Sequence, residues 1–103
     1  MREFLVEAYV PRFAAGGGAR YADDVSAAAE RTCGEGRYVR LRRWILIPED
    51  ETGFYLFHAQ SREAVREAAT RGGLKFERVV EAVSDCLGQA DSRLGPGGRS
   101  QRP

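Results

Sequence analysis

The sequence predicts an α+β domain whose elements follow the order strand, helix, strand, strand, helix, strand. Two stretches of alternating apolar and polar residues, 2–9 and 38–47, are each followed by a segment with helical or hairpin signals, and the pattern then repeats. This is the split βαβ order of a ferredoxin-like domain, a four-stranded antiparallel sheet with two helices on one face. The length of 103 residues suits one modest core.

The first strand is expected over 2–9, because alternation collects small and large apolar side chains on one face: Phe4, Val6 and Ala8. Pro11 ends this strand, and the glycines at 16–18 connect it to the first helix. Apolar residues at helical spacing place that helix at about 19–32, and Gly34 and Gly36 follow its last turn.

The second strand is expected over 37–47. Strict alternation sorts its residues into two faces, namely Tyr38, Arg40, Arg42, Trp44 and Leu46 against Val39, Leu41, Arg43, Ile45 and Ile47. The polar segment 48–53 contains proline and glycine and predicts a hairpin to a third strand over 54–59. In that strand, Phe54, Leu56 and His58 oppose Tyr55, Phe57 and Ala59.

The second helix begins after Ser61, a favourable N-cap residue, and ends at Gly72-Gly73. On this helix, Glu67 is interpreted as an exposed, solubilising charge. A short apolar strand over 78–83 completes the domain. Large apolar residues nearly vanish afterwards, so we expect a domain over 1–84 and a disordered tail over 85–103.

Composition excludes several classes of partner. The chain has 16 Lys and Arg against 15 Asp and Glu, a net charge of +1, which favours neither a nucleic acid nor an anionic membrane. No apolar run approaches the ~20 residues that a membrane helix needs. Cys33 and Cys86 are too few for a disulfide framework and lack C-x-x-C spacing, and we expect a cytoplasmic protein with reduced thiols.

The predicted fold leaves one face of the sheet without helices, although apolar residues occur on both faces of the strands. Such a face is expected to be an interface or a ligand site, and a two-fold homodimer would bury it. Alternation could also direct a group of charged and aromatic residues into a space between the sheets and the helices: Glu7, Tyr9, Arg40, Arg42, Trp44 and Glu81. These residues fit either a wet dimer interface or a ligand pocket. The arginines over 37–43 would then pair with Glu7 or Glu81, or bind an anionic ligand.

Three segments resemble a known family: residues 4–7, the hairpin 44–50 with 54–59, and the block 61–69 that leads through Gly73-Leu74 to 78–83. They are similar to the small nickel-binding-protein-like family, formerly a domain of unknown function. This family is found in many actinobacteria and belongs to the dimeric α/β-barrel group. The resemblance implies a ferredoxin-like homodimer that binds nickel or another divalent transition metal.

Candidate metal ligands are Glu7, His58 and Glu81, converging on one sheet face or doubled across a two-fold axis. His58 is the single imidazole of the chain, and Ala68 stands where family members usually carry a histidine. The alternative is a cofactor-independent enzyme of the cyclase, monooxygenase or isomerase type, acting on a small aromatic molecule in the barrel cavity. In that case His58 would be the acid or base, and the ligand-binding residues would be Tyr9, Arg42, Trp44 and Tyr55.

Overall fold

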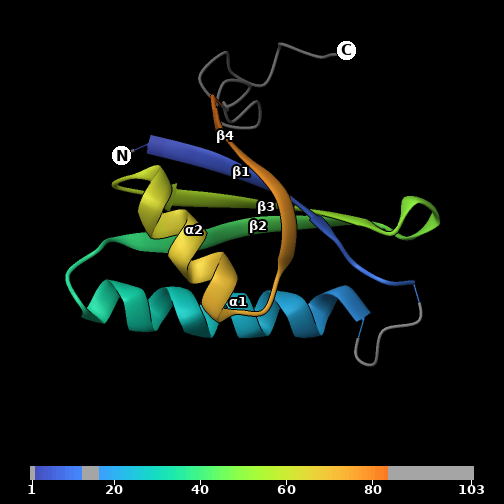
Figure 1. The fold of residues 1–103 in the computed structure, drawn as a ribbon, viewed down its shortest axis with the longest axis horizontal. Helices are drawn as coiled ribbons and strands as arrows, with labels where there is room; N and C mark the ends of the chain where they lie inside the picture. Colours follow the sequence, from blue (N-terminus) through green and yellow to red (C-terminus); the bar gives the residue numbers. More distant parts are fainter. Residues whose placement is uncertain (1, 13–16, 84–103) are drawn as a thin grey trace, which may run out of the picture.

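The computed structural model describes residues 2–12 and 17–83, which form one four-stranded sheet and two helices (Figure 1). In chain order the elements are β1 (Arg2–Tyr9), α1 (Gly17–Gly34), β2 (Val39–Ile47), the 3-10 turn η1 (Pro48–Asp50), β3 (Thr52–Ala59), α2 (Arg62–Arg71) and β4 (Lys75–Ala82). The strand order is β2-β3-β1-β4, and every neighbouring pair is antiparallel. The predicted α+β, ferredoxin-like arrangement is therefore confirmed. The expected tail over 85–103, with Cys86, lies outside the described residues.

The core lies between the helices and one face of the sheet. Alternation in β1 and β3 buries two matching rows, Phe4, Val6 and Ala8 beside Tyr55, Phe57 and Ala59. The helices add small and branched residues: Val25 and Ala29 from α1, and Ala64, Val65, Ala68 and Ala69 from α2. Because alanines dominate this contribution, the helices can lie close to the sheet and to each other.

The strict alternation predicted for β2 is wrong beyond Leu41. The register of β2 against β3 shifts between Leu41 and Arg43, which indicates a β-bulge. After the bulge, Trp44 pairs with Tyr55 and Leu46 with Gly53, on the side of the helices. Ile45 is opposite Phe54 and therefore lies on the other face, which we call the open face. Because the bulge inserts one residue, each side chain after it lies on the opposite face from the one that strict alternation predicts.

Helix and strand ends differ slightly from the predictions. The α1 helix begins at Gly17 and ends at Gly34, and β4 begins at Lys75, earlier than expected. Phe76 belongs to β4 because it pairs with Ala8 and packs against the core, after a register shift between Glu7 and Ala8. Neither helix among the described residues is long and apolar enough to cross a lipid bilayer.

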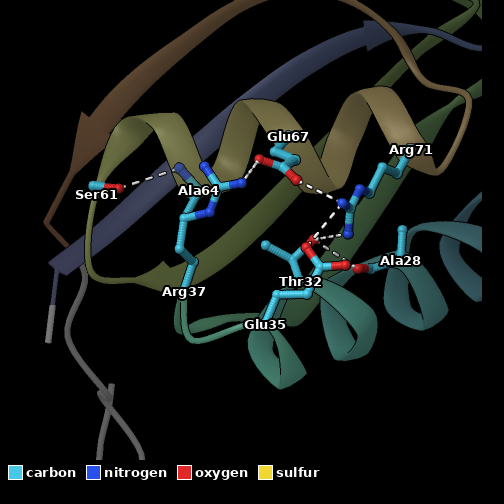
Figure 2. A network of polar contacts seen from close by, with 8 residues as sticks. All are labelled: Ala28, Thr32, Glu35, Arg37, Ser61, Ala64, Glu67 and Arg71. Carbon is cyan, nitrogen blue, oxygen red and sulfur yellow. Dashed lines mark hydrogen bonds and ion pairs between the residues drawn. The ribbon is translucent and has the colours of Figure 1, made fainter.

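The predicted N-cap of α2 is confirmed. The Ser61 hydroxyl accepts a hydrogen bond from the Ala64 amide at 3.2 Å (Figure 2). At the other end, Gly72 lies directly against α1. A Cβ atom added there would be 2.7 Å from both Cα and Cγ2 of Val25. The two helices therefore approach most closely where only a glycine fits.

A polar network joins the C-terminal end of α1 to α2 (Figure 2). The Arg71 guanidinium contacts Glu67 at 2.8 Å and Glu35 at 2.9 Å, and donates to the hydroxyl of buried Thr32 at 3.3 Å. Arg37 forms a second ion pair with Glu67. The pKa of Glu35 is lowered by its hydrogen bond from Arg71 and by the positive charge of that residue. This network fixes one helix relative to the other by charge and hydrogen bonding as well as by packing.

Candidate functional site

The described part of the open face carries seven large apolar side chains, none of which is buried. Strand pairing assigns them to this face: Leu5 and Tyr9 from β1, Phe54 and Leu56 from β3, Ile45 and Ile47 from β2, and Val80 from β4. Ile45 is 53% exposed and Tyr9 is 41% exposed. An apolar surface that spans all four strands is typical of an interface or a ligand site.

Two acid–base pairs lie among these apolar residues. His58 Nε2 on β3 is 2.8 Å from Glu3 Oε2 on β1, and the two residues are direct cross-strand partners. Farther along β1, Glu7 accepts a hydrogen bond from Arg78 Nε on β4 at 3.1 Å. Arg40 on β2 is the other cross-strand neighbour of His58. The single imidazole of the chain therefore lies on the open face between one carboxylate and one guanidinium.

The three residues suggested as metal ligands do not converge within one subunit. His58 and Glu7 share the open face, but Glu7 is four residues along β1 from the partner of His58, a separation of about 13 Å along a strand. Glu81 pairs with Phe4 and lies on the side of the helices. The described residues contain no group of three His, Cys, Asp or Glu side chains suited to a metal ion. One subunit supplies His58 and Glu3 as its closest set of donors.

Glu81 has a different role from the one suggested. Arg2 Nη2 contacts its carboxylate at 3.1 Å and Arg2 Nε donates a second hydrogen bond at 3.2 Å, so the pair is bidentate. These hydrogen bonds and the charge of Arg2 lower the pKa of Glu81 below its ordinary value of 4.5. The pair holds β4 against the first residues of β1.

The residues suggested for a small-molecule site are divided between the two faces of the sheet, although Trp44 and Tyr55 are cross-strand partners on the side of the helices. Tyr9 lies on the open face, whereas Tyr55 is fully buried on the opposite face. Burial raises the pKa of Tyr55 to about 12, and its hydroxyl has no hydrogen-bond partner among the described residues. Arg42 and Trp44 line a hollow of about 200 Å³ beside α1. His58 lies on the open face, so it does not share a cavity with Tyr55, Arg42 and Trp44 in which it could act as an acid or base.

The expected partners of the β2 arginines are also on other strands. Glu7 and Glu81 lie on β1 and β4, and β3 separates both strands from β2. Within the described part of the chain, Arg40, Arg42 and Arg43 make no ion pair. These guanidinium groups are therefore available to a ligand.

Sequence reasoning missed two features. The first is Glu3, because only the strand register shows that it faces His58. The second is a hollow of about 420 Å³ between α1 and β2, lined by Ser26, Ala29, Glu30, Cys33, Gly34, Tyr38, Val39, Arg40 and Leu41. No motif marks this hollow, because it depends on how the helix lies against the edge of the sheet.

Comparisons with known proteins support the fold. No protein-family model matches the sequence, and no curated protein matches it significantly. The fold is similar to the crystal structure of SCO4226 from Streptomyces coelicolor A3(2), with a TM-score of 0.67 and 16% sequence identity. The match covers 82% of this chain and 99% of that protein. At this identity the likeness establishes the fold alone.

Proposed function

We propose that this protein is a homodimer that buries the open face of its sheet and binds a divalent transition metal, nickel being the first to test, at His58 and Glu3. The observation that carries the proposal is the His58–Glu3 pair, which lies on an apolar sheet face that neither α1 nor α2 covers.

The dimer follows from the exposed apolar side chains. Sheets that pack face to face bury one side of each, with the two layers about 10 Å apart. A stable interface removes roughly 1,200–2,000 Å² from water in total, which the open face of a four-stranded sheet can supply. Leu5, Phe54 and Leu56 occupy the two middle strands, so they would form the dry centre. The charged Arg40 and Arg43 are on the edge strand, which suits a polar rim.

The metal site requires the second copy. One subunit offers one imidazole and one carboxylate, too few donors for a specific site. A two-fold axis near His58 would bring together two imidazoles and two carboxylates, a nitrogen and oxygen donor set that nickel(II) accepts. Arg40 beside His58 disfavours a cation, so both copies of Glu3 are needed to offset this charge. The nickel-binding-like resemblance of the sequence points to the same class of ligand.

The experiment combines sedimentation with calorimetry on untagged protein. We expect a dimer at micromolar concentration and one nickel ion bound per dimer when nickel chloride is titrated. Ile45→Asp should produce monomers, because Ile45 is 53% exposed on the open face and the change places a charge in the apolar surface that the dimer would bury. Ala27→Asp, an apolar-to-acid change on the exposed surface of α1, is the matched control and should remain dimeric.

His58→Ala should abolish nickel binding and leave the dimer intact. Glu81→Gln removes a carboxylate on the opposite face and should bind nickel normally. A monomer at tens of micromolar would contradict the dimer. Nickel binding that survives His58→Ala would contradict the site.

A further inference from the structure

The outer edge of β2 has no strand paired with it in the described part of the chain. There, β2 is the terminal strand of the sheet and pairs only with β3. Among the described residues, the backbone hydrogen bonds outside regular elements do not involve Val39–Ile47. An edge with unpaired N–H and C=O groups can accept an extended peptide as an additional strand.

Two hollows lie along the helix side of this edge. The larger, about 420 Å³, and the smaller, about 200 Å³, share Ser26 of α1 and Leu41 of β2, so they are adjacent, and we call the two together the groove. Ala29 and Leu41 make part of its wall apolar. The combined volume can hold several small side chains. Figure 1 shows α1 running alongside β2.

The other side of the edge is basic. Arg40 and Arg43 pair with His58 and Leu56 and therefore belong to the open face, although Arg40 also borders the larger hollow and Arg43 the smaller one. Arg42 lies at the bulge and lines the smaller hollow. None of the three makes an ion pair in the described residues. The acidic residues Asp23 and Glu30 line the hollows from α1, whereas the arginines line them from β2.

We propose that the edge of β2 and the groove beside it bind an extended peptide in which acidic residues alternate with small apolar ones. Side chains of a strand alternate between the faces of its sheet. The apolar residues of an added strand would enter the groove beside α1, and the acidic residues would lie next to Arg40 and Arg43 on the other face. Backbone hydrogen bonds to β2 would hold the peptide extended.

The charges disfavour a second copy of the chain as the occupant. Antiparallel pairing of two β2 strands would place Arg40, Arg42 and Arg43 of both copies close together, and like charges across neighbouring strands are destabilising. The same arginines and the bulge protect the edge from self-association. An acidic strand removes this penalty, since its carboxylates neutralise the guanidinium groups.

The probe is a short capped peptide of alternating glutamate and valine, titrated into the protein at low salt. Trp44 is the single tryptophan of the chain, is 39% exposed and lines the smaller hollow, so its fluorescence reports binding directly. We expect a saturable change that weakens with added salt. The double variant Arg40→Glu/Arg43→Glu should weaken binding at least about tenfold, because attraction becomes repulsion.

Three further measurements separate strand addition from charge alone. N-methylation of alternate peptide amides removes the backbone donors, and we expect it to abolish binding. A peptide with lysine in place of glutamate should not bind. Ser26→Leu fills the junction of the two hollows and should weaken binding without altering the sheet. Each of these results supports the proposal.

Several outcomes would overturn it. Equal binding of the methylated and unmodified peptides would show that no strand is added. Displacement of the peptide by a short single-stranded oligonucleotide at equal concentration would identify a general anion surface. Absence of any fluorescence change, with the fold of the protein confirmed by circular dichroism, would exclude the site. These outcomes concern the edge of the sheet and leave the dimer proposed through the open face untouched.

Discussion

Replacing Gly72 with alanine tests whether the closeness of the two helices determines the stability of this fold. Gly72 has φ −80° and ψ −2°, a conformation open to any residue, so the change introduces no backbone strain. The added methyl group would instead lie 2.7 Å from Cα and Cγ2 of Val25. Side-chain movement can relieve only the second contact, because Cα belongs to the backbone of α1. The helices must separate.

Overpacking of this kind costs about 1–3 kcal/mol. For a domain of this size, each kcal/mol lowers the melting temperature by about 4–8 °C, so Gly72→Ala should lower it by roughly 5–20 °C. Thermal and urea unfolding, followed by circular dichroism and by Trp44 fluorescence, would measure the change. Val25→Ala in the Gly72→Ala background should recover only part of the loss, since the contact with Cα persists.

Two other glycines provide matched controls. A Cβ on Gly34 meets nothing within 4 Å, so Gly34→Ala should change stability by no more than about 1 kcal/mol. A Cβ on Gly73 also meets nothing, but its φ of +81° is left-handed and should cost alanine about 1–2 kcal/mol. If Gly72→Ala were as stable as Gly34→Ala, the close approach of the helices would not be a determinant of stability.

Three further predictions concern single contacts. Ser61→Ala should destabilise the fold by about 1 kcal/mol because the Ala64 amide loses its acceptor, whereas Ser61→Asp should retain stability; thermal unfolding of both variants checks this. Tyr55→Phe should be neutral or slightly stabilising at pH 7, since the hydroxyl has no hydrogen-bond partner among residues 2–12 and 17–83. The raised pKa of Tyr55, about 12, means that the stability present below pH 10 is lost as pH rises through 12. The free energy of unfolding, measured by urea titration, should therefore fall less between pH 10 and 12 in Tyr55→Phe than in the wild type. The lowered pKa of Glu81 means that its stabilisation is present above about pH 4.5 and is lost as pH falls through the lowered value. Glu81→Gln should therefore reduce the loss of unfolding free energy at acid pH. If the variant lost as much as the wild type, the pair with Arg2 would contribute nothing to stability.

The order of elements could be predicted because each strand buries one face. Alternation in β1 and β3 therefore sorts their residues into the two faces correctly, and Ser61 and Gly72-Gly73 bound α2 by ordinary capping chemistry. The bulge in β2 could not be predicted in this way. It leaves no mark in a segment that is rich in arginine and apolar residues throughout, and it exchanges the faces of Trp44 and Ile45.

The candidate site was predicted only in part for a related reason. His58 stands out as the single imidazole, but its partner Glu3 is 55 positions away in sequence and becomes its neighbour only through the register of β1 and β3. Glu67 shows the same limit. The interpretation as a solubilising charge does not hold, because its side chain is 22% exposed and bridges Arg37 and Arg71. Contacts between distant segments depend on tertiary geometry, which local patterns do not encode.

The position of β1 between β3 and β4 has a consequence for how the protein is made. This strand leaves the ribosome before either neighbour, and its buried row, Phe4, Val6 and Ala8, is fully covered only after α2 has also emerged. Early folding intermediates therefore expose the apolar row of β1 during translation, when aggregation competes with folding. The sheet is complete only when its final strand, β4, has been added, so synthesis and folding of this domain finish almost together.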